Sequence, residues 1–124
     1  MGRPCTLADF AEDSHATAKD KGWWDDRPDY GDRVQAIPEK IALMHSELSE
    51  ALEEARAGNL NLYYGDANYA GDAGKPEGFG IELADCVIRI FDLCEALGID
   101  IQQMIEIKMA YNETRPHRHG GKNF

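Results

Sequence analysis

The sequence predicts an all-α protein whose subunit resembles a four-helix bundle. Apolar residues recur at helical spacing in four stretches, and a glycine or a proline follows each stretch. No segment has the convincing alternation of apolar and polar residues that marks a strand. With 124 residues, 43% of them hydrophobic, the chain is long enough for one hydrophobic core. We therefore expect a single domain over residues 1–124.

The first helix is expected over residues 6–21, where Thr6 is a suitable N-cap and Gly22 ends the pattern. A polar connection follows over residues 23–33. It contains a proline and a glycine, which favour turns over regular structure.

The second helix is expected to begin at Asp32, with Gln35 as its partner in a capping box. Pro38 then falls in the first turns, where proline is tolerated. The helix should run to about Ala57, where a glycine stops it. A long loop follows over about 58–76, and a connection of this length is typically functional or mobile.

The third helix, from near Phe79 to Leu97, is apolar on nearly every side. Such a helix must be covered all round, and three other helices of a small chain hardly suffice. We therefore expect a subunit interface on this helix and a protein that dimerises. Cys86 and Cys94 lie on it and are expected to be free, buried thiols.

The fourth helix should begin at Asp100, with Gln103 completing a capping box, and run to about Thr114. A proline breaks it, and a short basic tail follows over about 115–124.

Composition narrows the classes of function. The net charge of −10 argues against a general nucleic-acid-binding surface, which would be basic. Three cysteines (Cys5, Cys86 and Cys94) cannot form a closed disulfide set. No window approaches a membrane span, and the N-terminus lacks the apolar run of a signal peptide. We expect a cytoplasmic protein with no membrane partner.

Two short acidic motifs lie in the second and third predicted helices: Glu47-Leu-Ser-Glu50 and Glu82-Leu-Ala-Asp85. A step of three residues keeps both carboxylates of a pair on one helix face. Four carboxylates brought together repel one another and should bind protons or a cation. An all-oxygen cluster suits Mg²⁺, with Mn²⁺ as an alternative. The competing interpretation is two solvated acidic faces, with Arg89 as a structural partner of Asp85.

The C-terminal part of the chain supplies cations. Lys108 and Asn112 are one turn apart on the fourth helix, and Arg115 and Lys122 follow. Such groups can grip phosphate oxygens. Taken alone, these cations are better explained as groups that offset the helix C-terminus and an acidic surface.

Two adjacent tryptophans stand near the end of the first helix. Trp23 and Trp24 could provide one core anchor and one platform on which a base stacks, or both could pack against helices. His15, at a helical position between Asp13 and Lys19, is expected at the surface on its pattern alone.

Along the chain, the Glu47–Glu50 motif comes first, then a long gap, the Glu82–Asp85 motif and a helix with Lys108 and Asn112. This order of motifs resembles that of the MazG-like all-α nucleoside triphosphate pyrophosphohydrolases. The words SELSEALEE, ELADCVIRIFDL and KMAYNETRPHRHGGK look like the small single-domain members, and the resemblance covers about residues 32–124. It implies a helical bundle that forms a homodimer, often a dimer of dimers, with active sites at the subunit interface. The stretch between Glu50 and Glu82 is longer than is usual in the family, so the loop there can reshape the pocket.

The resemblance also implies an activity. It is Mg²⁺-dependent hydrolysis of (deoxy)nucleoside triphosphates, standard or modified, to a monophosphate and pyrophosphate, in the role of clearing the nucleotide pool. Glu47, Glu50, Glu82 and Asp85 would be the metal ligands, and Glu47 or Glu50 would orient the attacking water.

For the substrate, the resemblance implies phosphate or sugar contacts at Lys108, Asn112, Arg115 and Lys122. His15 and Trp24 correspond to base-side contacts of some relatives. Two alternatives remain open: a phosphoribosyl-ATP pyrophosphohydrolase of the same broad fold, and a helical metal-binding module with an interaction or regulatory role and no turnover.

Overall fold

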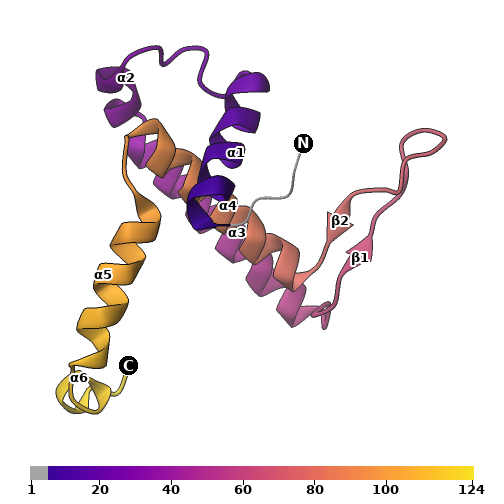
Figure 1. The fold of residues 1–124 in the computed structure, drawn as a ribbon. Helices are drawn as coiled ribbons and strands as arrows, with labels where there is room; N and C mark the ends of the chain where they lie inside the picture. The colour runs from indigo at the N-terminus through magenta and orange to yellow at the C-terminus, as the bar shows by residue number, and fades with distance from the viewer. Residues whose placement is uncertain (1–5) are drawn as a thin grey trace.

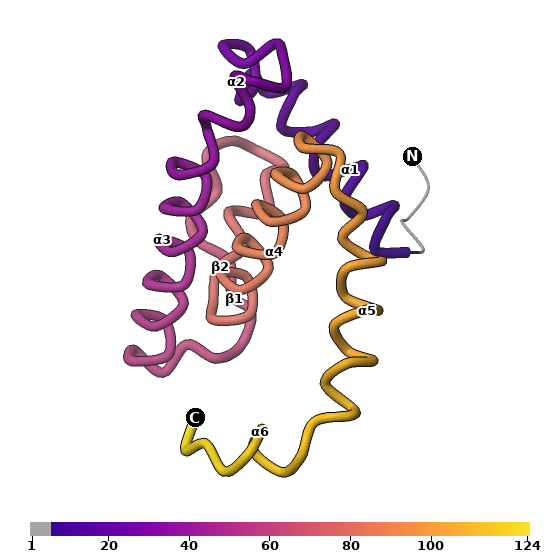
Figure 2. Tube along the Cα trace, turned by 90° about the vertical axis from the view of Figure 1, so that its left-hand side faces the viewer, coloured from indigo at the N-terminus to yellow at the C-terminus, as the bar shows by residue number. Residues whose placement is uncertain are grey.

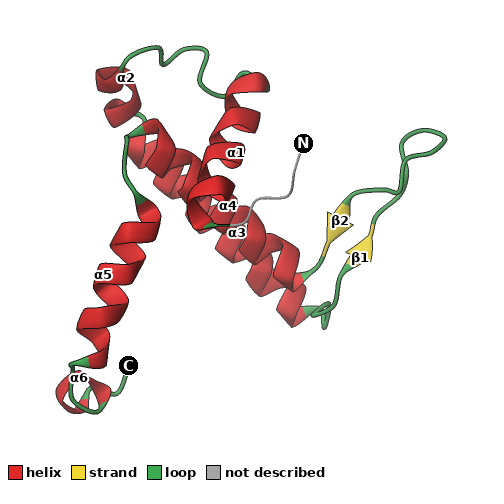
Figure 3. Cartoon of the chain, viewed as in Figure 1, coloured by secondary structure: helices red, strands yellow, loops and turns green. Residues whose placement is uncertain are grey.

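Most of the chain is helical in the computed structural model, which describes residues 6–124 (Figures 1 and 3). The elements are α1 (Leu7–Asp20), α2 (Tyr30–Gln35), α3 (Ile37–Arg56), β1 (Tyr63–Tyr64), β2 (Pro76–Glu77), α4 (Phe79–Ala96), α5 (Ile101–Glu113) and α6 (Arg118–Gly121). The predicted all-α class is confirmed. None of the helices in this part of the chain has the length and apolar character that crossing a membrane requires.

Two predicted helix starts are confirmed by their caps. Thr6 Oγ1 accepts the backbone N–H of Asp9 at 3.1 Å, and the Asp9 carboxylate accepts the N–H of Thr6 at 3.1 Å. At α5, the Asp100 carboxylate accepts the N–H of Gln103 at 3.0 Å. These bonds satisfy amide groups that the first turn of a helix leaves without a partner.

The predicted cap at Asp32 is wrong. The cap is Asp29, whose Oδ1 accepts the N–H of Asp32 at 2.8 Å and starts the short helix α2. A turn at the buried Ala36 separates α2 from α3. Pro38 explains the break, because its ring would clash with the carbonyl of Val34 in a continuous helix.

The core lies where α3 and α4 run antiparallel, with α1 crossing α4 (Figure 1). Its buried members are small or apolar side chains from these helices and the α1–α3 connection: Trp24, Ala36, Met44, Cys86, Leu93 and Ala96. Both described cysteines are free thiols as predicted, Cys86 buried and Cys94 half-buried. Cys5 lies outside the described residues.

The fourth long helix does not join this group. α5 has limited contact with α1 and diverges from α3 and α4, as Figure 2 shows. We call α5 and α6 the C-terminal arm. Within one chain, three long helices pack together and the arm projects, so the described residues do not show the predicted four-helix bundle of one subunit.

Large apolar side chains stay exposed on α4 and on the arm. On α4, which α1 and α3 cover only in part, Val87 is 43% and Ile88 48% exposed. On the arm, Ile107 and Met109 are 58% and 59% exposed. Exposed apolar side chains grouped on a helix are often covered by a protein partner.

The predicted loop over about 58–76 contains structure that its sequence does not predict. β1 pairs antiparallel with β2, with Tyr63 opposite Glu77. The Tyr63 hydroxyl also donates to Glu54 Oε2 at 2.9 Å, which ties the hairpin to the end of α3. The hairpin stands out from the helices (Figure 1).

The start of α4 depends on a glycine. Gly78 has a φ of +122°, and a Cβ there would lie 2.5 Å from the carbonyl oxygen of Asn61. Only glycine fits both constraints. The next amide, of Phe79, donates to the Asn59 carbonyl at 2.9 Å, so α4 begins at a fixed point with Glu82 in its first turn.

Candidate functional site: a carboxylate cluster beside a cleft

Three of the four predicted carboxylates come together where α3 faces α4. One oxygen each of Glu47, Glu82 and Asp85 lies within 4.8 Å of the others. Glu47 and Glu82 are each only 7% exposed, and Asp85 is half-buried. Glu50 is exposed one turn further along α3 and hydrogen-bonds to Glu82. We call Glu47, Glu82 and Asp85 the carboxylate cluster.

The donor set fits a small hard cation. Mg²⁺ takes oxygen ligands at about 2.1 Å, so opposite ligands of one ion lie about 4.2 Å apart. Oxygens within 4.8 Å of one another therefore need only small side-chain rotations to share an ion. All of the clustered ligands are carboxylates, the class that Mg²⁺ and Mn²⁺ prefer over softer metals.

Burial and mutual repulsion hold protons on this cluster. The pKa of Glu82 is raised to about 7, first by burial, then by its hydrogen bond to Glu50 and the charge of Glu50, and finally by the charges of Asp85 and Glu47. The pKa of Asp85 is also raised, by burial and by Glu47, although Arg89 and Lys75 oppose the rise. The site therefore favours added positive charge near neutral pH.

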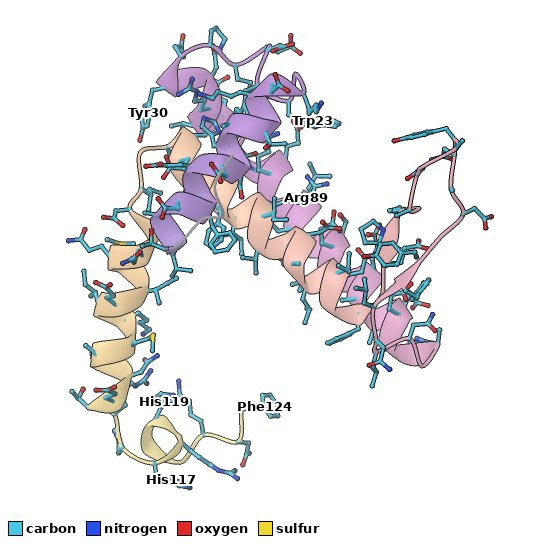
Figure 4. The ribbon with its side chains drawn as sticks, turned by 45° about the vertical axis from the view of Figure 1, so that its right-hand side comes forward. Trp23, Tyr30, Arg89, His117, His119 and Phe124 are labelled. Atoms are coloured by element: carbon cyan, nitrogen blue, oxygen red, sulfur yellow. The ribbon has the colours of Figure 1, made fainter. Side chains whose placement is uncertain are left out.

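Arg89 pairs with a different carboxylate from the one expected. Its Nε donates to Glu47 Oε1 at 2.9 Å, across from α4 to α3, whereas its spacing suggested Asp85. This bond fixes the orientation of Glu47 and compensates part of the clustered charge. The Arg89 side chain is 39% exposed, so it remains open to a ligand (Figure 4).

A cleft of about 620 Å³ opens beside the cluster, between α1, α3 and α4. Glu47 and Asp85 belong to its lining. The lining also includes three cations and two aromatic rings: Lys21, Lys40, Arg89, Phe10 and Trp23. This volume suits a nucleotide-sized ligand. Neither Lys21 nor Lys40 is among the predicted site residues, although Lys40 lies about two helical turns before Glu47 and so shares its face.

His15 and Trp24 are buried rather than open to a ligand. His15 is 8% exposed, so its expected surface position is wrong, and Trp24 is 4% exposed. His15 Nδ1 lies 2.7 Å and Trp24 Nε1 2.8 Å from Oδ1 of Asp92 on α4. The hydrogen bonds of these two side chains are therefore to Asp92 of the protein.

The exposed tryptophan is the neighbour, Trp23, which is 69% exposed and lines the cleft (Figure 4). The two tryptophans therefore match the first of the two predicted alternatives, in which one ring anchors the core and the other is open to a ligand. The open ring is Trp23, and the core anchor is Trp24, the residue that the resemblance had assigned to the substrate.

The predicted phosphate-binding residues lie on or beside the C-terminal arm, away from the cluster of their own chain (Figure 2). Lys108, Asn112 and Lys122 are exposed, and Arg115 is half-buried. Lys108 Nζ lies 4.8 Å and the Arg115 guanidinium 5.6 Å from the ring centre of Tyr111. The structure of one chain groups these cations with one another and leaves them apart from the carboxylates.

No protein-family model matches the chain, and no curated protein or solved structure matches it. The motifs, the carboxylate cluster and the cleft are therefore the features of this chain that bear on its function.

The raised pKa of Glu82 predicts a pH-dependent stability. Without metal, its carboxyl binds a proton more tightly in the folded than in the unfolded chain, where the pKa is 4.5. The resulting stabilisation is present below pH 4.5 and is lost as the pH rises through about 7. Urea unfolding in EDTA, repeated from pH 4.5 to 8.5, should show the free energy of unfolding of Glu82→Gln falling less over this range than that of the parent.

The matched control is Glu53→Gln, whose side chain is 72% exposed on the same helix as Glu47. It should reproduce the pH profile of the parent. Parallel profiles for the parent and Glu82→Gln would show that Glu82 does not hold a proton at neutral pH.

Proposed function

We propose that the protein is a Mg²⁺-dependent nucleoside triphosphate pyrophosphohydrolase, which releases a nucleoside monophosphate and pyrophosphate in the cytoplasm. The observation that carries the proposal is the carboxylate cluster beside a nucleotide-sized cleft whose lining also holds Lys21, Lys40 and Arg89. Metal-binding oxygens, cations and an aromatic ring at one cleft suit a ligand with both phosphates and a base.

In the proposed site, Glu47, Glu82 and Asp85 hold the cation, with Glu50 beside them. When bound, Mg²⁺ supplies positive charge to the phosphate oxygens, and Mn²⁺ can take its place. Binding also removes the repulsion that raises the pKa values of Glu82 and Asp85. A triphosphate brings further negative charge, which Arg89 beside the cluster is suited to offset.

The chain's own groups then have separate tasks. Arg89 is partly exposed beside the cluster and can donate to a phosphate oxygen while its Nε keeps Glu47 oriented. The exposed Glu50 carboxylate is free of Arg89 and is the group we assign to accept the proton of the attacking water. The water oxygen bonds to phosphorus as the bond between the α- and β-phosphates breaks, and pyrophosphate leaves.

A second copy of the chain completes the proposed enzyme. The exposed apolar side chains of α4 and the arm offer the surface for a homodimer, or for a dimer of dimers. The arm of one subunit would bring Lys108, Asn112, Arg115 and Lys122 to the carboxylates of the other, and its helix would complete a bundle of four.

Pyrophosphate release from a nucleotide panel that includes phosphoribosyl-ATP tests the activity. With Mg²⁺ the parent should turn over at least one nucleoside triphosphate, and EDTA should abolish release. Glu47→Gln should lower kcat/KM about a hundredfold or more, because the site loses a negative charge that the cation needs. Glu53→Gln, the control on the same helix, should behave as the parent.

Equal rates for the parent and Glu47→Gln would refute the site. No release from any nucleotide would refute the enzyme and favour a metal-binding module. Turnover restricted to phosphoribosyl-ATP would assign the alternative substrate.

Mixing two inactive variants tests the shared site. Glu47→Gln lacks a carboxylate, and Lys108→Ala lacks a cation on the arm. If an arm serves the partner's carboxylates, a mixed dimer contains one site with both defects and one intact site. Random mixing should then restore about a quarter of the parent activity, because half of the dimers are mixed and half of their sites are intact.

The control is the mixture of Glu47→Gln with Asp85→Asn, which places both defects in the same half of the site and should restore nothing. Light scattering gives the subunit number. A monomeric parent, or no recovery from dimers that demonstrably mix, would contradict the proposed assembly.

A further inference from the structure

The cleft has a second polar end, away from the carboxylate cluster. Lys40 lies about two helical turns before Glu47 on α3, and Asp92 lies about two turns after Asp85 on α4. Because α3 and α4 are antiparallel, Lys40 and Asp92 are both displaced from the carboxylate cluster in the same direction, by about 10 Å along the helices. Both side chains line the cleft, as does the exposed ring of Trp23.

Asp92 is a fixed carboxylate with one oxygen available. Both of its hydrogen bonds within the described residues, from His15 Nδ1 and Trp24 Nε1, go to Oδ1. An ionised carboxylate only accepts hydrogen bonds, so both ring nitrogens donate. The two bonds orient the side chain, which is 13% exposed, and within residues 6–124 Oδ2 accepts no hydrogen bond. Because Asp92 lines the cleft, we take Oδ2 as the acceptor available to a ligand there.

Lys40 is a buried cation whose charge meets no carboxylate. The residue is 9% exposed, and its Nζ lies 4.5 Å from the ring centre of Trp24. Within residues 6–124 its ammonium forms no ion pair and no hydrogen bond, although Glu39 and Asp92 line the same cleft. A ring face compensates only part of the lost hydration of an ammonium group, so this donor favours a polar ligand.

We propose that Asp92 and Lys40 determine base specificity by reading the edge of a nucleobase that stacks on Trp23. Asp92 Oδ2 accepts a hydrogen bond from an exocyclic amino group, and Lys40 donates to the neighbouring ring nitrogen or keto oxygen. This inference rests on the proposed function, which places the phosphates at the carboxylate cluster. The sugar of such a nucleotide separates the base from the phosphates. The base therefore lies toward the end of the cleft that holds Lys40 and Asp92.

The chemistry of Asp92 selects one class of base. A phosphate at this end would meet the negative charge of Asp92, whereas an amino group would not. Cytosine, adenine and guanine present amino groups. Uracil and thymine present one N–H between two keto oxygens, and a carboxylate that accepts from it is repelled by both. The predicted substrates are therefore nucleotides with amino-bearing bases.

Asp92→Asn should reverse the preference without removing the bonds that hold the side chain. His15 and Trp24 require an acceptor at the position of Oδ1, so the amide oxygen occupies it and the NH₂ group takes the place of Oδ2. The cleft then presents a donor where it presented an acceptor. A donor there favours the keto oxygen of uracil or thymine.

Calorimetry with the full chain, Mg²⁺ and the α,β-imido analogues of dCTP and dUTP measures the preference. The parent should bind the cytosine analogue about tenfold or more tightly than the uracil analogue, because an unpaired buried polar group costs that much or more. Asp92→Asn should lose or invert this ratio. Lys40→Met should bind the cytosine analogue more weakly than the parent does.

Asp26→Asn, the same change at an exposed position next to the tryptophans, should keep the parent ratio. Equal binding of the two analogues by the parent would overturn the proposal, whether or not the variants fold. An unchanged ratio in folded Asp92→Asn, or unchanged affinity in Lys40→Met, would also overturn it.

Pyrophosphate release from dCTP and dUTP separates this inference from the proposed activity. Base-selective binding without release supports base reading and refutes the hydrolase. Release without selectivity refutes base reading and leaves the hydrolase. The absence of any binding overturns both.

Discussion

The repulsion among Glu47, Glu82 and Asp85 is the constraint to which the rest of the structure responds. Three carboxylates with oxygens within 4.8 Å of one another oppose the packing of α3 on α4. Burial of apolar side chains such as Met44 and Leu93 brings the helices together despite it. The ion pair of Arg89 with Glu47 offsets part of the repulsion, as does the proton that Glu82 retains because its pKa is raised. A bound cation would offset the remainder.

The docking of α1 links the stability of the fold to the proposed recognition of a base. His15 and Trp24 donate to one oxygen of Asp92, and these two bonds tie α1 and the segment after it to α4. The same bonds fix the carboxylate of Asp92, whose other oxygen is the one proposed to contact a base. A change that loosens α1 should therefore weaken both the fold and any base selectivity, whereas every member of the carboxylate cluster lies on α3 or α4.

Local features of the chain were predictable from the sequence, and features that need a distant neighbour were not. The caps at Thr6 and Asp100 and the pairing of Glu82 with Asp85 on one helix face depend on residues a few positions apart. The partner of Arg89 depends on which helix lies opposite α4, and spacing along one helix cannot give it. The burial of His15 likewise depends on α1 crossing α4, which brings Asp92 to a residue that lies between the charged Asp13 and Lys19 along the helix.

Direct binding of Mn²⁺, followed by the loss of the paramagnetic signal of the free ion, tests most directly whether the carboxylate cluster holds a divalent cation. We expect one saturable ion per chain that Mg²⁺ displaces. Asp85→Asn should weaken its binding about tenfold or more, and Glu53→Gln should leave it as in the parent. Absence of saturable binding, or equal affinity in the parent and Asp85→Asn, would show that the carboxylate cluster does not hold a divalent cation.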